Sequence, residues 1–239
     1  MIARLVAALA AAVLASAPVA VASPPAPPTP IVPPPVQPAN IGALKTEARG
    51  YYHSGAYLTD LQQAAWPAIP WIDVRAPMVD RPAVVFDIDE TALSNRPALE
   101  ANDLGRIFTG PCDLPQGPCG LVDWDLSAAA SEIPPTMDVF NTAKDRGAAI
   151  YFITGRNESQ RAATERNLTN VGYTGYTRLI MEPDDAHYVS AADFKAPQRH
   201  AIEAEGYTII ANLGDQPSDL EGGFTERTFL LPNPFYRIP

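Results

Sequence analysis

Two acidic residues that directly follow an apolar run are the first feature of this sequence that could do chemistry. Residues 82–95 read PAVVFDIDETALSN, so Asp87 and Asp89 come straight after the run 83–86. Residues two positions apart in an extended segment point to the same side, and both carboxylates can therefore reach one reacting atom. One can attack as a nucleophile while the other donates and then accepts a proton, if their surroundings push the two pKa values apart.

Crowded carboxylates need a cation, because like charges destabilise one another unless a counterion binds or one group keeps its proton. Asp215 and Asp219 also follow an apolar run, at 209–213. Mg²⁺ suits such a group of acids, since it prefers oxygen ligands and often shares its coordination with a substrate phosphate. We therefore expect a Mg²⁺ site formed by Asp87, Asp89, Asp215 and Asp219.

The segment ITGRNESQ at 153–160 supplies hydroxyl and backbone donors. Thr154 and the backbone turn after it can donate hydrogen bonds to a phosphoryl oxygen, at the start of an expected helix whose free N–H groups favour anions. Arg156 is a further candidate for substrate binding, although an arginine here could equally serve a structural ion pair.

The segment DFKAPQR at 193–199 supplies Lys195 near the start of another expected helix, with Arg199 four residues later on the same face. Phosphoryl transfer depends mainly on positioning and on neutralising charge at the phosphoryl oxygens. A lysine and a Mg²⁺ that face two aspartates therefore form a coherent catalytic group. Arg199 is a candidate for substrate binding, with the same structural alternative as Arg156.

Short apolar runs alternate with helical patterns, which predicts an α/β domain with a mostly parallel sheet flanked by helices. Strands are expected at 83–86, 148–153, 177–181, 207–213 and 227–231, and helices near 136–146, 157–170 and 193–205. Two further helical segments in 41–66 are expected to end near Pro67 and Pro70. Ligands bind at the carboxyl ends of parallel strands, which is where the polar residues above occur.

The first 40 residues have features of export rather than of a fold. A positive start and the apolar run 5–14 precede small residues at 20–22, which predicts a signal peptide at 1–22, cleaved after Ala22. The run is shorter than the roughly 20 residues that span a bilayer, and no cysteine nearby can accept a lipid. We therefore expect a secreted or periplasmic protein without a stable membrane anchor, and a disordered Pro-rich linker at 23–40.

The composition fits one domain and argues against polyanionic partners. The chain has 239 residues, a formal net charge of -10 and a sequence pI near 4.7. It can bury one sizeable core, which we expect at 41–239. Nucleic acid polymers and anionic membranes bind to basic surfaces, so neither is an expected partner. An anionic substrate must instead be attracted by local positive groups.

The chain has two cysteines, Cys112 and Cys119, in the segment CDLPQGPC. Their spacing does not match the CxxC pairs of metal and redox sites. In an exported protein the two are expected to form a disulfide that pins this loop.

Three residues near the first acids have structural interpretations. Glu90 is expected to face solvent or to cap a helix rather than to bind the metal. Asn95 could hold the loop that follows Asp87. Trp124 could stack on an aromatic leaving group, but we expect it to pack the segment around it onto the core.

Taken together, four segments resemble the motifs of the haloacid dehalogenase (HAD) superfamily. DIDET, ITGR, FK and GDQPSD occur in the order and approximate spacing of its four motifs. VVFDIDETALSN and LPNPFY look like the acid phosphatases of subfamily IIIB, which are related to bacterial class C acid phosphatases and plant vegetative storage proteins. The resemblance covers roughly residues 41–239. It implies a HAD-like Rossmannoid three-layer sandwich with sheet order 5-4-1-2-3, N-terminal helices and a small cap insert, here at 96–135.

The resemblance also implies roles for the matching residues. Asp87 would be the nucleophile that becomes phosphoaspartate, and Asp89 would be the general acid and then the base. Thr154 would bind the phosphoryl group together with the backbone of Gly155. Lys195 would hold the nucleophile and the phosphate together.

The implied Mg²⁺ shell consists of the carboxylates of Asp87 and Asp215 and the backbone carbonyl of Asp89. Asp219 would support this shell from outside it or through water. An acid at position 89 points to phosphate esters as substrates, since the dehalogenases of the superfamily lack an acid there.

The sequence therefore predicts an exported, Mg²⁺-dependent acid phosphatase that hydrolyses small phosphomonoesters through a phosphoaspartyl intermediate. Two alternatives stay open. The chain could be a 5′-nucleotidase or a phosphotransferase of the same fold, with Trp124 and nearby aromatic residues gripping a base. It could also be a non-catalytic storage or binding protein, although the presence of Asp87 counts against that interpretation.

Overall fold

The computed structural model describes residues 37–239 of the chain. The expected signal peptide at 1–22 and most of the expected linker at 23–40 lie outside the described residues. Among residues 37–239, none of the helices combines the length and the apolar character that a membrane span needs.

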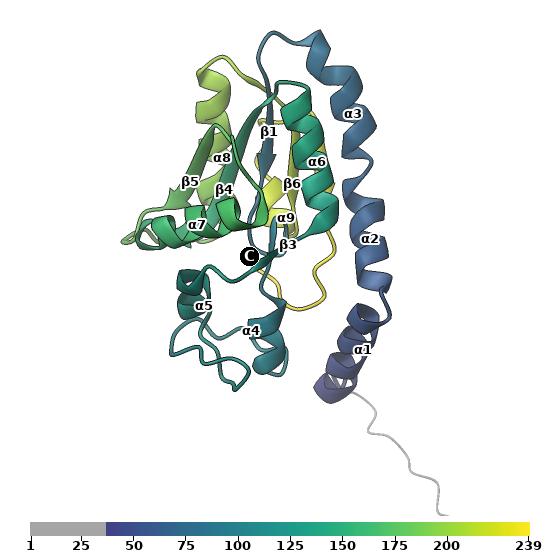
Figure 1. Cartoon of the computed structure of the whole chain (residues 1–239), viewed down its shortest axis with the longest axis vertical. Helices are drawn as coiled ribbons and strands as arrows, with labels where there is room; N and C mark the ends of the chain where they lie inside the picture. Colours follow the sequence, from purple (N-terminus) through teal and green to yellow (C-terminus); the bar gives the residue numbers. More distant parts are fainter. Residues whose placement is uncertain (1–36) are drawn as a thin grey trace, which may run out of the picture. The chain divides into compact units, whose positions relative to one another are not determined.

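A five-stranded parallel sheet forms the centre of the domain (Figure 1). Its strands are β1 (Pro82–Phe86), β4 (Ala149–Asn157), β5 (Arg178–Glu182), β6 (Thr208–Gly214) and β7 (Thr228–Leu230). They lie in the order β5-β4-β1-β6-β7, and every neighbouring pair is parallel. Numbered along the chain and read from the β7 edge, these strands have the order 5-4-1-2-3, which confirms the expected α/β sheet.

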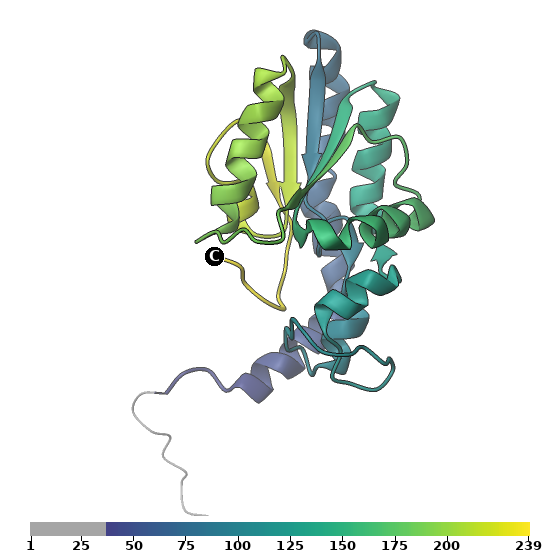
Figure 2. The same ribbon diagram turned by 90° about the vertical axis from the view of Figure 1, so that its left-hand side faces the viewer.

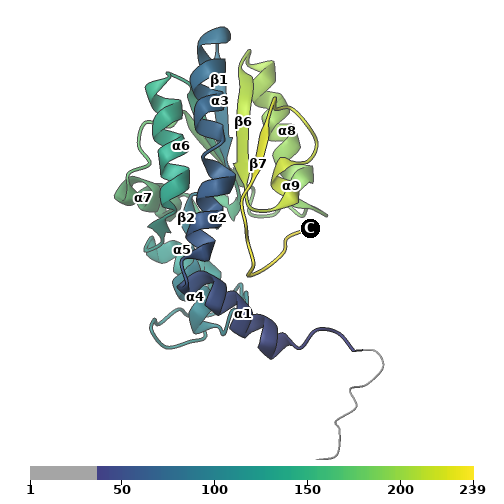
Figure 3. The same ribbon diagram turned by 90° about the vertical axis from the view of Figure 1, so that its right-hand side faces the viewer.

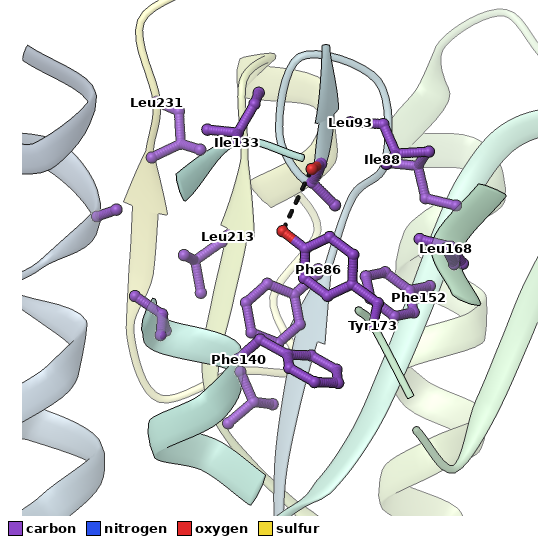
Figure 4. Packing of buried hydrophobic residues seen from close by; sticks show 14 of the residues in the cluster. Phe86, Ile88, Leu93, Ile133, Phe140, Phe152, Leu168, Tyr173, Leu213 and Leu231 are labelled. Atoms are coloured by element: carbon purple, nitrogen blue, oxygen red, sulfur yellow. Dashed lines mark hydrogen bonds between the residues drawn. The ribbon is translucent and has the colours of Figure 1, made fainter. Parts of the chain in front are cut away.

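The apolar runs become strands because both faces of the sheet are covered. On one face, Phe86 at the end of β1 packs against Phe140 and Phe152, and Phe140 in turn packs against Tyr173 (Figure 4). Burial of each such ring contributes roughly 1.5–3 kcal/mol. The hydroxyl of Tyr173 donates a hydrogen bond to the carbonyl of Ala92 at 3.2 Å, so the same cluster also holds the loop that follows β1.

Helices on both faces of the sheet give three layers (Figures 1 and 2). One face is covered by α2 (Ala56–Ala65), α3 (Ala68–Arg75) and α6 (Pro134–Asp145), and the other by α8 (Ala191–Ala204). Two further helices, α7 (Arg161–Val171) and the short α9 (Pro217–Leu220), follow β4 and β6. Phe194 and Ile202 of α8 pack on Val85 and Tyr151, which fixes α8 beside the carboxyl end of β1.

Within residues 37–239, three α-helices rather than two precede the sheet (Figure 3). They are α1 (Ile41–His53), α2 and α3. The expectation that helical structure ends near Pro67 and Pro70 is wrong for Pro70, which is the third residue of α3. Proline is tolerated in the first turn of a helix, because the N–H that it lacks has no partner there.

An insert separates β1 from β4 beyond the carboxyl ends of the strands (Figure 2). Short antiparallel strands β2 (Leu93–Ser94) and β3 (Ser131–Glu132) pair where the chain leaves and re-enters the sheet domain. Between them lie α4 (Arg96–Ala101) and α5 (Leu121–Ser127), neither of which the sequence pattern predicted. The expected disulfide between Cys112 and Cys119 is present and closes the loop before α5.

Candidate active site

The carboxyl ends of the central strands open into a pocket of about 480 Å³. The sheet domain contributes four residues that we call the pocket floor: Asp87, Lys195, Asp215 and Asp219. Among the lining residues of the insert, we call Arg106, Phe108 and Asp125 the insert wall. The end of the chain also lines the pocket, through Tyr236, Ile238 and Pro239.

Lys195 links two acids of the pocket floor. Its Nζ donates a hydrogen bond to Asp87 and another, 2.6 Å long, to Oδ1 of Asp219. All three side chains are buried. Burial disfavours the ammonium group, but the carboxylates of Asp219 and Asp87 outweigh this cost and raise the pKa of Lys195. The lysine is therefore a fixed positive charge beside the carboxylate of Asp87.

Asp87 is held by the backbone of the neighbouring strand. Its N–H donates to the carbonyl of Leu213 at 2.9 Å, so the sheet hydrogen bonding continues past the end of β1. Burial raises the pKa of Asp87 well above its usual range; Lys195 opposes this, while Asp219 and Asp215 add to it. A bound cation would relieve that repulsion and favour the carboxylate.

Asp215 and Asp219 reach the pocket from the end of β6. Gly214 is required between the strand and Asp219, because a Cβ at Gly214 would lie 2.5 Å from the Cβ of Asp219. The carboxylate of Asp215 accepts hydrogen bonds from Asn233 at 2.7 Å and from Thr91 at 3.2 Å. Burial and the neighbouring Asp219 raise its pKa to about 7.

The donor set of the pocket floor fits a hard divalent cation. Asp87, Asp215 and Asp219 each offer a carboxylate oxygen, and these atoms lie within 4.8 Å of one another. All three are oxygen ligands, which Mg²⁺ prefers. Within residues 37–239 the carboxylate of Asp89 is not part of this cluster. The residue types predicted that four carboxylates surround one cation. This prediction is wrong for the carboxylate of Asp89.

Asp89 points instead toward the insert and the end of β4. Its carboxylate accepts hydrogen bonds from Arg156 Nη2 at 2.6 Å and from Asn95 Nδ2 at 2.7 Å. Burial raises the pKa of Asp89, but the charge and hydrogen bonds of Arg156 and Asn95 outweigh burial and lower it overall. Two neighbouring aspartates thus have pKa values shifted in opposite directions by different partners.

Arg156 joins Asp89 to the insert wall. Its Nη2 also lies 3.0 Å from Oδ1 of Asp125 on α5, and its side chain is only 2% exposed. Gln160 donates to the other oxygen of Asp125 at 2.9 Å. Burial raises the pKa of Asp125 to about 7, with Arg156 opposing the effect. The sequence motifs did not identify Asp125, because it occurs in a segment without a recognised pattern.

The other residues of the ITGR segment lie differently from expectation. Thr154 and Gly155 belong to the last residues of β4, where its pairing with β5 is irregular, and helical structure begins at Glu158. They therefore do not start a helix. Gly155 and Arg156 line the pocket. Thr154 is fully buried, and its Oγ1 accepts a hydrogen bond from the N–H of Arg156 at 3.1 Å.

Arg199 is buried away from the pocket lining. Its guanidinium donates to the carbonyls of Asp219 at 2.7 Å, Gly223 at 2.9 Å and Glu221. These bonds hold the segment after β6 in place, because they satisfy carbonyls at and beyond the short helix α9. The position supports the structural alternative, and we leave Arg199 out of the proposed substrate contacts.

Glu90 is buried, so the expectation that it faces solvent or caps a helix is wrong. It has a φ of 54°, which turns the chain sharply after Asp89. Its carboxylate accepts hydrogen bonds from the N–H of Asn95 at 2.6 Å and from the hydroxyl of Tyr236. Asn95 therefore holds this loop, as expected.

The C-terminal segment supports the pocket from outside the sheet. Asn233 donates to Asp215, Tyr236 donates to Glu90, and the N–H of Ile238 donates to Gln216 at 3.0 Å. Asn233 and Tyr236 lie in the segment LPNPFY, and Ile238 follows it. The sequence pattern alone did not predict that this segment contacts the acids.

Trp124 packs inside the insert rather than in the pocket. It is 5% exposed, and its Nε1 donates to Oδ1 of Asn95 at 2.9 Å. The packing role expected for Trp124 is confirmed. The aromatic residues that do line the pocket are Phe108, Tyr188 and Tyr236.

Comparison with known proteins places the chain in a family. Residues 35–239 match the family described as HAD superfamily, subfamily IIIB (Acid phosphatase). The chain is 32% identical over 155 residues to Acid phosphatase 1 of Solanum lycopersicum. It is 35% identical over 159 residues to the Stem 28 kDa glycoprotein of Glycine max and 29% identical over 156 residues to Vegetative storage protein 1 of Arabidopsis thaliana.

These matches cover 64%, 64% and 65% of the chain, and they span 58%, 59% and 55% of the relatives' own lengths. Among solved structures, the class C acid phosphatase from Bacillus anthracis with tungstate bound has a TM-score of 0.63 and 22% identity. That likeness covers 81% of this chain and 85% of the bacterial one, and it shows a shared fold. With the family match extending from residue 35 to residue 239, the chain belongs to the HAD superfamily, subfamily IIIB (Acid phosphatase).

Proposed function

We propose that this protein is a Mg²⁺-dependent phosphatase that hydrolyses small phosphomonoesters through a phosphoaspartyl intermediate. The observation that carries the proposal is the arrangement of the pocket floor. A buried lysine contacts Asp87 and Asp219, and three carboxylates lie within 4.8 Å of one another in an open pocket. Membership of an acid phosphatase family and the name of the tomato relative support the same activity.

In the first proposed step, a carboxylate oxygen of Asp87 attacks the phosphorus. A bond forms between this oxygen and phosphorus, while the bond from phosphorus to the ester oxygen breaks. Asp89 gives its proton to the departing oxygen, so the leaving group departs as an alcohol. Lys195 stabilises the charge on the phosphoryl oxygens, and the backbone of Gly155 and Arg156 faces the same space.

In the second step, water attacks the phosphoaspartate. Asp89 accepts a proton from that water, the bond between Asp87 and phosphorus breaks, and inorganic phosphate leaves. Asp87 and Asp89 have different surroundings: a bound cation would keep Asp87 as the carboxylate that attacks, whereas the hydrogen bonds from Arg156 and Asn95 orient Asp89 for proton transfer.

Asp87, Asp215 and Asp219 would hold the metal through carboxylate oxygens, with the backbone carbonyl of Asp89 as a further ligand. A bound Mg²⁺ would neutralise phosphoryl charge and the mutual repulsion of these acids. Burial and Asp219 raise the pKa of Asp215, and a cation bound between these acids would oppose that effect. The tungstate in the bacterial structure is a tetrahedral oxyanion, which supports phosphate-like ligands for this fold.

Hydrolysis of a generic aryl phosphate by the purified protein tests the proposal. We expect turnover that is lost after treatment with EDTA and restored by Mg²⁺. Retained turnover in metal-free protein would contradict the metal requirement. A preparation that is inert toward aryl, sugar and nucleoside phosphates, with and without alcohol acceptors, would instead favour a storage or binding role, which the stem glycoprotein and storage-protein relatives make reasonable.

We also propose that the chain is exported. The disulfide between Cys112 and Cys119 supports this, because disulfides persist outside reducing compartments. The names of two relatives as stem glycoproteins agree with it. Mass spectrometry of protein recovered from its natural host should find it outside the cytoplasm with Ser23 as the first residue. Recovery in the cytoplasm with residues 1–22 intact would contradict export.

A further inference from the structure

Arg106 differs from the other cations that line the pocket. Lys195 contacts two carboxylates, and Arg156 contacts two others. Arg106 lines the same pocket, but within residues 37–239 no carboxylate lies within the 4.0 Å of an ion pair with it. Its Nε is buried and has no hydrogen-bond partner among the described residues. The pocket therefore has a guanidinium whose donors are available to a ligand.

Aromatic stacking holds this guanidinium in place. Its central carbon lies 3.9 Å from the ring centroid of Phe108 and 5.0 Å from that of Tyr236. Such contacts fix an arginine by its flat faces and leave its N–H groups around the edge free to donate. Phe108 comes from the insert and Tyr236 from the C-terminal segment, so Arg106 lies where these two segments meet.

The backbone that carries Arg106 is also fixed. The carbonyls of Ile107 and Phe108 accept hydrogen bonds from the N–H groups of Leu121 and Val122, at 2.8 and 3.1 Å. These bonds tie the segment to the first turn of α5, which also carries Asp125. Arg106 thus projects from a supported part of the insert.

The location of Arg106 assigns it to one end of a bound ester. The pocket floor, where the phosphorus would be attacked, comes from the sheet domain, and Arg106 comes from the insert beyond the carboxyl ends of the strands (Figure 2). Asp89, the proposed proton donor to the leaving oxygen, is linked to the insert through Arg156 and Asp125, so the insert that carries Arg106 borders the leaving-group side of the pocket.

We propose that Arg106 binds an anionic group, a carboxylate or a second phosphate, on the leaving-group part of the substrate. The inference rests on the proposed phosphatase function and narrows its substrate class to phosphomonoesters that carry a further negative charge. The planar fork of a guanidinium matches the two oxygens of a carboxylate or phosphate. In a chain with net charge -10, such a cation is also the local attraction that an anionic substrate needs.

Binding of three probes to the Asp87→Asn variant tests the inference without turnover. Phenyl phosphate lacks a second anion, 4-carboxyphenyl phosphate has a carboxylate, and 1,4-phenylene bisphosphate has a second phosphate. Calorimetry in the presence of Mg²⁺ measures the three affinities with and without the further change Arg106→Gln. We expect Arg106→Gln to weaken binding of at least one doubly anionic probe by about 10- to 100-fold, and binding of phenyl phosphate by less than about 3-fold.

The two anionic probes distinguish a carboxylate from a phosphate as the preferred group. Equal losses for all three probes would overturn the inference, since Arg106 would then serve the shared phosphoryl group or the fold. Unchanged affinities would overturn it as well. Arg106→Lys should keep part of the preference, because it keeps the charge but loses the stacked fork.

Arg227→Gln is the matched control. Arg227 also lies over an aromatic ring, with 4.1 Å between its central carbon and the Trp71 centroid, but it does not line the pocket. Turnover of phenyl phosphate by the unmodified chain separates the two proposals. A preference lost with Arg106 in a chain that shows no turnover would support the binding site and reject the phosphatase function. Turnover without any preference would reject the binding site alone.

Discussion

The pocket floor and the insert wall contribute positive charge to the same pocket in opposite ways. On the floor, Lys195 is buried, and its ammonium group forms ion pairs with both Asp87 and Asp219. On the wall, Arg106 has aromatic neighbours and no acid within ion-pairing distance in residues 37–239. The positive charge of the floor is thus already paired with acids, while the positive charge of Arg106 on the wall is available to a ligand.

Asp125 and Arg156 connect these two regions. Arg156 belongs to the sheet domain and contacts both Asp89 and Asp125 of the insert wall. The comparison therefore predicts effects of three sizes. Changes to the floor should abolish most of the activity, and a change to the contact between Asp125 and Arg156 should lower kcat moderately. Changes to the exposed contacts of the insert should have a small effect on stability.

The largest effect is expected from the nucleophile. Asp87→Asn should lower kcat by roughly 10⁴-fold or more, because an amide cannot form the phosphoaspartyl bond. Steady-state hydrolysis of phenyl phosphate measures the loss. Asp145→Asn, a change at an exposed aspartate at the end of α6, is the control and should leave kcat unchanged. Similar turnover in both variants would remove Asp87 from the mechanism.

Lys195→Met should next lower stability as well as activity. It leaves Asp87 and Asp219 buried without their shared counterion, and we expect the free energy of unfolding to fall by about 3–5 kcal/mol. Urea unfolding with and without Mg²⁺ measures this, and Mg²⁺ should recover more stability in the variant than in the unmodified chain. Lys144→Met, whose Nζ donates only to the carbonyl of Thr174 at 2.9 Å, should change little. Equal stability of the two variants would show that Lys195 does not offset the buried charges of Asp87 and Asp219.

Asp125→Asn probes the connection between floor and wall. The substitution keeps an acceptor for Gln160 but removes the charge that holds Arg156, so Asp89 loses part of its orientation. We expect kcat to fall about 10-fold for all phosphate esters alike, with KM nearly unchanged. Asp123→Asn on the same helix is the control. A selective loss for one leaving group would instead make Asp125 a substrate contact.

The smallest effect is expected where α1 contacts the insert. Asp103 accepts hydrogen bonds from Arg49 and from Lys45, the latter at 2.7 Å, and these bonds lower its pKa to about 2. A carboxyl whose folded pKa lies below its unfolded value near 3.9 contributes stability above that value and loses it as pH falls toward the folded pKa.

Asp103→Asn should therefore lower Tm slightly at pH 6, and the difference from the unmodified chain should shrink as pH falls from about 5 to 2. Thermal melts across this range measure it. Because the pair is exposed, 1 M NaCl should reduce the difference at pH 6. A difference that is constant with pH would show that the charge of Asp103 is not responsible.

The amino-acid sequence predicted the floor well, because its residues occur directly after strands. Apolar runs that are buried on both faces must form central parallel strands, and the residues that follow such strands must meet at one edge of the sheet. The order of four short segments therefore predicted that the side chains at the site lie close together, namely those of Asp87, Asp215, Asp219 and Lys195. The strand order was predicted from the resemblance to the HAD superfamily.

Side-chain direction could not be predicted in this way. Asp89 was grouped with the other acids, yet Arg156 and Asn95 turn its carboxylate away from them. Arg199 lies on the same helix as Lys195, but its guanidinium donates hydrogen bonds to backbone carbonyls beyond β6. Glu90 is an acid in a turn, a usual surface position, and is buried because Tyr236 and Asn95 supply donors. In each case a partner distant in sequence decided the orientation.

The sequence by itself determined the parallel sheet, the edge where the candidate site lies and the acids and lysine at that edge, since hydrophobic periodicity and strand ends are local properties of the chain. Only the tertiary structure decided which charges are compensated. It placed Asp125 against Arg156, and it placed Arg106 beside Phe108 and Tyr236 with no acid in ion-pairing distance among residues 37–239. The physical reason is that charge compensation depends on distances of a few ångströms between segments far apart in sequence, and no local pattern encodes those distances.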